Sequence, residues 1–323
     1  MSRSSHEIPL LLNQTGGFNP GPQTMVKQAM TTLIHDATRD ISYASSAKSR
    51  AGAAMIRLLE NSTGRLRLIR RAAGYEREMS LGRSFWQVVP ERYGLQLRVI
   101  GGQLSNIPRT GPLVVIANHP FGILDGLMMG NLLHQTRGDF RILANSVFMK
   151  AEALRRVVLP ISFDATKEAQ RLNIETREDS LRYLGQGGVI GVFPGGTVST
   201  SATPFSRPMD PAWRNFTAKM ISKSGATVVP VYFAGQNSRL FQWASHLHSN
   251  LRLGLLIKEF RSRLDEPVDV VIGEPLAAGQ LAALRGDPTQ MMEFLRKSTY
   301  DLSPEPQRSY DLGYEFDEKY RSR

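Results

Sequence analysis

One histidine and one carboxylate stand close together where an apolar run gives way to a turn. The run ends at Asn118-His119, a short turn rich in Pro and Gly follows, and Asp125 opens a second apolar run. A neutral imidazole is the usual general base near pH 7, and a nearby carboxylate fixes its tautomer and stabilises the imidazolium that forms. The pattern therefore allows His119 to take a proton from a hydroxyl while Asp125 orients the ring.

The same residues also have a simpler interpretation. His119 would then be a hydrogen-bonded loop histidine, and Asp125 would cap the N-terminus of a helix. Taken alone, the pair favours this interpretation, because short motifs often match by chance.

A second candidate site is the glycine-containing loop Phe193-Pro194-Gly195-Gly196-Thr197. Glycines let backbone N–H groups approach a ligand and form an anion-binding nest, which could hold an oxyanion or a phosphate. The alternative is an ordinary strand-to-loop turn. The loop matches neither nucleotide-binding glycine pattern, and the chain lacks the Gly-x-Ser-x-Gly motif of serine hydrolases. The spacing of the histidines indicates no metal site.

Alternating apolar runs and helical stretches predict an α/β fold for the region that carries these loops. The strands are expected at 113–117, 140–144, 157–163, 189–193, 228–233 and 268–272. The helices are expected at 125–135, 167–185, 213–223, 251–263 and 287–301. Because most of the strands are apolar throughout rather than alternating, we expect helices on both faces of the sheet.

The chain carries a formal net charge of +11 over 323 residues and has no cysteine. The charge points to an anionic partner, and the absence of cysteine excludes disulfides and thiolate chemistry. Nucleic acid is the least favoured partner, because aromatic residues are not interleaved with the basic cluster as stacking platforms. No apolar run reaches the roughly 20 residues of a membrane-spanning helix, and no secretory signal is recognisable. We expect a peripheral protein on the cytoplasmic side of the inner membrane.

The basic charge is concentrated before residue 96. Residues 1–25 are expected to form a flexible leader, and residues 26–95 a helical, basic extension. A basic amphipathic helix can lie on an anionic membrane, with its arginines at the headgroups. The alternative is a helix packed on the core with a solvated basic face. The arginines expected at the membrane surface are Arg65, Arg67, Arg70 and Arg71.

Three motifs in order resemble those of the lysophospholipid acyltransferase family, the glycerolipid acyltransferases with a His–Asp motif. They are Asn118-His119 with Asp125, the loop Phe193–Thr197, and Val228–Val231. The resemblance covers roughly residues 85–280. It implies a glycerol-3-phosphate-acyltransferase-like fold, which is a mixed, mostly parallel sheet covered by helices, here with a helical N-terminal extension. The acyltransferase domain is expected to span residues 96–302, followed by a tail at 303–323 that is either disordered or docked by its aromatic residues.

The resemblance implies transfer of an acyl group from a thioester to a hydroxyl, with His119 as the base and Asp125 as its partner. Asn118 and the residues from Phe193 to Thr197 would line the acceptor or oxyanion pocket. No cofactor is needed beyond the acyl-CoA or acyl-carrier-protein substrate, since a thioester is already activated. Possible contacts to the donor phosphate or the headgroup are Arg141, Asn145 and Lys150.

Two departures from the family pattern bear on the acceptor. Five residues separate His119 from Asp125 where four are usual, and the common Phe-Pro-Glu-Gly-Thr-Arg reads Phe193–Val198, without its charged residues. This longer form resembles the hemolysin-like or lyso-ornithine-lipid O-acyltransferase branch. It implies an acceptor without phosphate, such as a lyso-amino-acid lipid of the ornithine type. Acylation of 1-acylglycerol-3-phosphate is the alternative, and a catalytically silent, basic binding protein is a more distant one.

Overall fold

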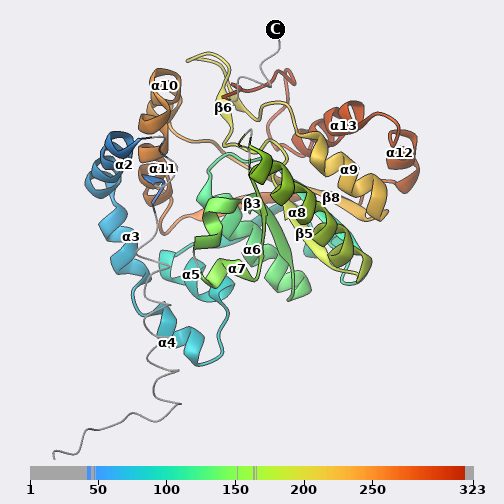
Figure 1. Ribbon diagram of the computed structural model, residues 1–323, viewed down its shortest axis with the longest axis horizontal. Helices are drawn as coiled ribbons and strands as arrows, with labels where there is room; N and C mark the ends of the chain where they lie inside the picture. The colour runs from blue at the N-terminus through green and yellow to red at the C-terminus, as the bar shows by residue number, and fades with distance from the viewer. Residues whose placement is uncertain are drawn as a thin grey trace, which may run out of the picture.

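The computed structural model describes residues 42–44, 47, 49–150, 152–162, 164 and 166–316. Within this part of the chain, a seven-stranded sheet has the order β1-β9-β8-β2-β5-β3-β4 (Figure 1). Strands β8, β2, β5, β3 and β4 are parallel, β9 is antiparallel to β8, and β1 is parallel to β9. The strands are β1 (Gln96–Gly102), β2 (Leu113–Ala117), β3 (Arg141–Asn145), β4 (Val158–Ile161), β5 (Val189–Val192), β8 (Thr227–Phe233) and β9 (Pro267–Ile272), and a separate hairpin pairs β6 (Thr200–Ser201) with β7 (Pro208–Met209).

Helices precede, connect and follow the strands of this sheet. The α-helices are α2 (Arg50–Thr63), α3 (Arg65–Ala72), α4 (Tyr75–Ser80), α5 (Phe85–Tyr93), α6 (Ile123–Arg137), α7 (Glu152–Arg155), α8 (Lys167–Gly185), α9 (Asn215–Ser224), α10 (Arg239–Leu247), α11 (Ser249–Arg261), α12 (Ala278–Ala283) and α13 (Pro288–Tyr300), and η2 (Leu104–Asn106) and η3 (Ser146–Lys150) are short 3-10 helices. Among the described residues, no helix has the length and apolar character needed to cross a membrane.

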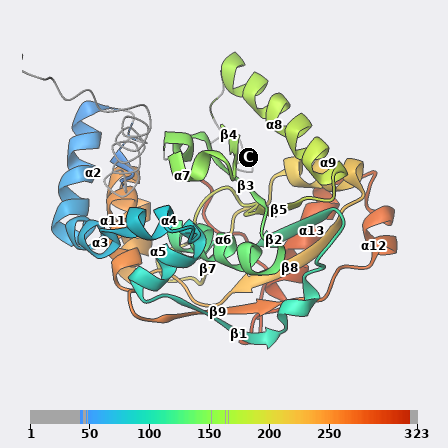
Figure 2. The ribbon, with the colours of Figure 1, turned by 90° about the horizontal axis from the view of Figure 1, so that it is seen from below.

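Two hydrophobic cores lie on opposite faces of the sheet, as the continuously apolar strands predict. On β2, Leu113, Val115 and Ala117 pack into a core with α3, α5, α6 and α11. The intervening residues Val114 and Ile116 pack into the other core, with α8, α9 and α13. Figure 2 shows the helices of these two groups on different sides of the strands. The prediction of a mixed, mostly parallel sheet covered by helices is confirmed.

Several elements escaped the sequence-based prediction. Strand β1 alternates between exposed and half-buried residues, so it lacks the continuously apolar run that identified the central strands. The hairpin of β6 and β7 consists of two-residue strands, which are too short for any periodicity. Helix α10 was also missed, and α6 begins at Ile123, two residues before the expected start.

The N-terminal extension packs on the domain where it is described, and the proposed leader, residues 1–25, lies outside the described residues. Gly64 separates α2 from α3, and α2 lies along α11. Of the four arginines expected at a membrane surface, Arg65 is buried and Arg71 pairs with Asp265. Arg67 and Arg70 are exposed, and Arg71 is half-buried in its ion pair at the surface.

The described part of the tail, up to residue 316, docks on the loops that follow the sheet. Gly313 donates its N–H to the carbonyl of Asp210, and Tyr314 donates to Thr200. A side chain at Gly313 would collide with the carbonyl oxygen of Met209, 1.8 Å from the position of its Cβ. The close approach of the two backbones therefore requires glycine at this point.

Candidate active site

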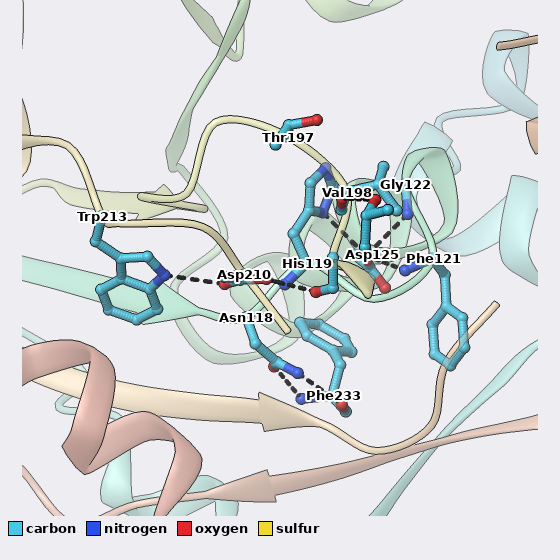
Figure 3. Close-up of polar contacts among 12 residues, drawn as sticks. Asn118, His119, Phe121, Gly122, Asp125, Thr197, Val198, Asp210, Trp213 and Phe233 are labelled. Carbon is cyan, nitrogen blue, oxygen red and sulfur yellow. Dashed lines mark hydrogen bonds and ion pairs between the residues drawn. The ribbon is translucent and has the colours of Figure 1, made fainter. Parts of the chain in front are cut away.

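The turn between β2 and α6 brings His119 and Asp125 together (Figure 3). Nδ1 of His119 lies 2.9 Å from Oδ2 of Asp125. The same Oδ2 accepts the N–H groups of Phe121, at 2.8 Å, and Gly122, at 3.0 Å. Gly122 has a φ of +93°, which glycine adopts without strain, and this conformation starts the helix. Asp125 thus caps α6 and contacts His119 with the same oxygen.

Asp125 is inaccessible to solvent. The residue is fully buried, and burial raises the pKa of its carboxyl, while His119 and the two backbone donors act in the opposite direction. Two backbone N–H groups donate to Oδ2, and Nδ1 of His119 lies within ion-pair distance of the same atom, an arrangement that an ionised carboxylate satisfies. A carboxylate oxygen only accepts hydrogen bonds, so the contact favours the tautomer with a proton on Nδ1. That tautomer leaves Nε2 of His119 free to accept a proton.

Phe193 holds the other face of the imidazole. Its ring stacks on that of His119, with 4.4 Å between the centroids and 27° between the planes. Phe193 comes directly after β5, the neighbour of β2, so the carboxyl ends of two parallel strands supply the histidine and its support. The side chain of His119 keeps 18% of its surface exposed, which leaves one edge of the ring accessible.

Asn118 has a structural role rather than the predicted one in substrate or oxyanion binding. Its Nδ2 donates to the carbonyl of Phe233 at 2.9 Å, and its Oδ1 accepts the N–H of Phe233 at 2.7 Å. Both ends of the buried amide are therefore used to tie the end of β2 to the end of β8. This pairing fixes the position from which His119 departs.

Asp210, in the loop after β7, clamps the second loop to the first. Its Oδ1 accepts the N–H of His119 at 3.2 Å and the hydroxyl of Ser199, and its Oδ2 accepts Trp213 Nε1 at 2.9 Å. Ser199 in turn donates its N–H to the carbonyl of His119 at 2.8 Å. The fully buried Asp210 carboxylate thus contacts the backbone on which the candidate base sits.

A cleft of about 1240 Å³ opens beside His119. It exceeds the usual volume of a small-molecule site, roughly 300–1,000 Å³, and is large enough for an acyl chain together with a second substrate. Its walls are mainly apolar and come from both sides of the molecule, including α2 and α11 on one side and α8 and α9 on the other. Among the described lining residues the basic side chains are Arg57, Arg177, Arg214, Lys219 and Arg252, and the acidic side chain is Asp164.

The structure places most of the predicted glycine-loop residues at the cleft, but not all of them. Phe193, Pro194, Gly196 and Thr197 line the cleft. Gly195 lies behind it, where a Cβ atom would stand 3.3 Å from the side chain of Asp210. The two glycines therefore differ: Gly195 makes room for the Asp210 clamp, and Gly196 forms the exposed turn with a φ of +69°.

Of the residues predicted to contact the phosphate or the head group, one lines the cleft and one does not. Arg141 begins β3, at the edge of the parallel sheet opposite to the site, where it pairs with Asp139 and stacks on Tyr183. It does not line the cleft, so this part of the prediction is wrong. Asn145, at the other end of β3, does line the cleft. The Lys150 side chain lies outside the described residues.

Sequence reasoning missed two polar residues that the structure brings to the site. Asp210 lies three residues before Trp213, in a segment to which the sequence analysis assigned no chemical role. Arg252 lies on α11, more than 50 residues after the glycine loop, and its Nη2 donates to Thr197 Oγ1 and to the carbonyl of Val198, both at 3.0 Å. No local pattern marks a single arginine in such a helix.

The chain is similar in sequence to known proteins. Residues 51–308 match the model of a family described as "Acyltransferase". A lyso-glycine lipid O-acyltransferase of Bacteroides thetaiotaomicron is 24% identical over 235 residues, which cover 70% of this chain and 82% of the relative. A protein of the same name from Phocaeicola vulgatus is 24% identical over 207 residues, 62% of this chain and 71% of the relative. The crystal structure of the 1-acyl-sn-glycerophosphate acyltransferase PlsC from Thermotoga maritima matches with a TM-score of 0.43 and 15% identity, covering 88% of this chain and all of that chain.

Proposed function

The chain belongs to the acyltransferase family, and from this premise we propose that it moves a fatty acyl group from a thioester to the hydroxyl of a single-chain lyso-amino-acid lipid. The observation that carries the proposal is the contact of His119 with the buried Asp125 at the edge of a large apolar cleft. A base with one accessible edge and a long apolar binding space are what the acylation of a lipid hydroxyl requires.

In the proposed reaction His119 acts through Nε2. The acceptor hydroxyl gives its proton to Nε2 as its oxygen attacks the thioester carbonyl carbon, and Asp125 stabilises the imidazolium. The tetrahedral intermediate then collapses, the C–S bond breaks, and the thiolate takes the proton back from His119. The products are an ester and a free thiol, so the histidine returns to its neutral form without any further reactant.

The negative oxygen of the intermediate needs hydrogen-bond donors. Among the described residues, no acceptor is found for the backbone N–H groups of Thr197 and Val198, and both residues line the cleft. We assign these two groups as the oxyanion donors. This assignment keeps the predicted function of the glycine loop but moves it from Gly195, which lies behind the loop, to the residues after Gly196.

The charge of the cleft supports an anionic acceptor. A lyso-amino-acid lipid carries a 3-hydroxy acyl chain and no phosphate, and its head group has a free carboxylate. An ornithine head group adds an ammonium, for which Asp164 is the single acidic side chain among the described lining residues. The two relatives are named for a lyso-glycine lipid. We therefore favour a glycine-type head group over the ornithine type, with 1-acylglycerol-3-phosphate as the competing acceptor.

The donor is proposed to be acyl-CoA or acyl carrier protein. Both present the thioester on a phosphopantetheine arm, whose phosphate needs a basic partner. Arg177 on α8 and Lys219 on α9 line the side of the cleft opposite to α11, and we assign the phosphate to this side. A basic rim there would also attract an acidic carrier protein.

A membrane-facing side is proposed for the helices α2, α3 and α10, which gather on one side of the molecule in Figure 1. On α10, Leu240, Trp243 and Leu247 form a stripe at helical spacing and are exposed by 51%, 46% and 77%. Phe205 packs edge-on against Trp243 and extends the apolar surface. With Arg67 and Arg70 exposed on α3, this side combines apolar and basic groups, as an interfacial membrane surface requires.

Sedimentation with lipid vesicles tests the membrane assignment. Replacing Leu240, Trp243 and Leu247 by Ser should weaken binding at least tenfold, because each large apolar side chain contributes about 1.5–3 kcal/mol on burial. The same three substitutions should leave acyl transfer to detergent-dispersed acceptor unchanged. Unaltered vesicle binding by this variant would remove α10 from the membrane surface.

The reaction itself is tested by supplying the purified protein with acyl-CoA or acyl carrier protein and candidate lyso-lipids, and reading the products by mass spectrometry. We expect a di-acylated amino lipid, and a loss of at least about 100-fold in His119→Ala. Formation of phosphatidic acid alone would reject the proposed acceptor. Undiminished transfer by His119→Ala would reject the mechanism.

A further inference from the structure

Arg252 is a buried cation that has no carboxylate partner among the described residues. It is 7% exposed, and no ion pair joins it to an acidic residue in the described part of the chain. Burial lowers the pKa of Arg252 to about 10, which still leaves the guanidinium charged at neutral pH. Burying a charge is unfavourable unless a group of opposite charge lies beside it, so an unpaired buried guanidinium suggests that a ligand supplies the negative charge.

The described residues form hydrogen bonds with only one of the three guanidinium nitrogens of Arg252. Its hydrogen bonds to the described residues all come from Nη2, which reaches Thr197 Oγ1, the Val198 carbonyl and, at 3.4 Å, Thr200 Oγ1. Nε is buried and has no partner among the described residues. The rings of Phe316 and Phe241 lie at 4.3 and 5.5 Å from the guanidinium carbon and hold it in place.

Another buried arginine shows what a purely structural arrangement looks like in this fold. Like Arg252, Arg296 has no carboxylate partner and a buried Nε without a hydrogen bond among the described residues, but both of its terminal nitrogens are used: Nη1 donates to the Tyr310 carbonyl, and Nη2 to those of Asp210 and Asp311. Arg296 does not line the cleft. Arg252 differs on both counts, because it lines the cleft and its hydrogen bonds use a single nitrogen.

The position of Arg252 fits the acceptor rather than the donor. The loop that it contacts carries no charged side chain between Phe193 and Ala202, so the guanidinium is the charge supplied to this part of the site. Val198 and Leu256 also close around Gly122, next to the candidate base; a Cβ there would lie 3.3 and 3.4 Å from them. Arg177 and Lys219, assigned above to the donor, belong to the opposite wall.

We propose that Arg252 binds the carboxylate of the acceptor head group and so selects a lyso-amino-acid lipid with a free acid. This inference rests on the proposed function and adds the residue that recognises the head group. Guanidinium groups form strong, charge-assisted hydrogen bonds with carboxylates, and Nη1 of Arg252 makes no hydrogen bond to the described residues. The head group would lie against α11, with the acyl chain along the apolar walls.

The test compares lyso-glycine lipid with its methyl ester, which keeps the hydroxyl and the chain but has no charge. For the natural protein we expect kcat/KM to be roughly 10- to 100-fold higher for the free acid, as a hydrogen bond to a charged group provides. In Arg252→Met this preference should fall to about one, mainly through the KM for the acceptor. Arg261→Met, on the same helix but exposed, should retain the preference.

Equal rates with acid and ester in the natural protein would overturn the inference, and this measurement needs no variant. A preference that persists in Arg252→Met, or a variant effect confined to the KM for the donor, would also overturn it. Activity of Arg252→Met on the methyl ester reports that the variant is folded, and Arg252→Lys serves as a milder substitution if it is not. Failure of the proposed function is distinct, because neither the acid nor the ester would then be acylated.

Discussion

Replacing Asp125 with Asn isolates the charge behind His119. The substitution keeps the size of the side chain, and an amide oxygen can still accept the N–H groups of Phe121 and Gly122. The neutral amide oxygen is, however, a weaker partner than a carboxylate oxygen for Nδ1 of His119, which lies 2.9 Å from Oδ2 in the natural protein. The imidazole therefore loses both its tautomer restraint and the charge that stabilises its protonated form.

The magnitude follows from the distance. The nitrogen and oxygen lie 2.9 Å apart, so the centres of charge of the imidazolium and the carboxylate are about 4 Å apart. At an effective dielectric constant of about 20, this pair is worth about 4 kcal/mol. If that stabilisation develops only in the transition state, kcat should fall about 1,000-fold. Stability should not fall with it, since the variant no longer buries a carboxylate.

Release of free thiol from acyl-CoA measures this rate directly. The chain contains no cysteine, so a thiol reagent reports the product without background from the protein. Asp179→Asn, at an exposed position on α8, is a matched control that should retain full activity. A folded Asp125→Asn variant whose kcat falls less than tenfold, or whose defect appears only in KM, would refute the assigned role of the carboxylate.

Three further predictions concern stability. Burial raises the folded-state pKa of Asp125 above its usual 3.8, so the stability contributed by its protonated form is lost as pH rises above about 4, and the Tm of the natural protein relative to that of Asp125→Asn should fall over the same direction of pH change. Gly130→Ala should lower the free energy of unfolding, measured with a denaturant, by about 1–3 kcal/mol, because the added Cβ would lie 2.1 Å from the Trp86 ring. Gly126→Ala on the same helix adds a Cβ to open space, so its free energy of unfolding should be unchanged or higher. Asp210→Ala leaves buried donors of the His119 and Ser199 loops without an acceptor, so both Tm and kcat should fall; an unchanged kcat would contradict its positioning role.

The parts of the site that could be predicted are those encoded locally. His119, Asp125 and the turn between them lie within seven consecutive residues, and both strands that lead into the site are short apolar runs. For the same reason the two-sided cover of the sheet was predictable, because a strand buried on both faces shows no alternation.

What could not be predicted depends on contacts between distant segments. Asn118 is adjacent to His119 in the sequence motif, yet both ends of its amide are hydrogen-bonded to the backbone of Phe233, 115 residues away. Arg65 and Arg71 share one helix with the exposed Arg67, and only tertiary packing decides which of them turn inward. The same holds for Arg252, whose partners lie more than 50 residues earlier in the chain.

The compactness of the His119–Asp125 turn has a consequence for how specificity can change over evolution. The candidate base and its carboxylate lie in one turn, where Asp125 accepts two backbone N–H groups, while α2, α8, α9 and α11 contribute to the walls of the cleft. Substitutions in those helices can reshape the site for another head group or chain without disturbing the alignment of the base. Exchange of α11 between relatives is therefore a direct route to altered acceptor choice with the proton-transfer apparatus kept intact.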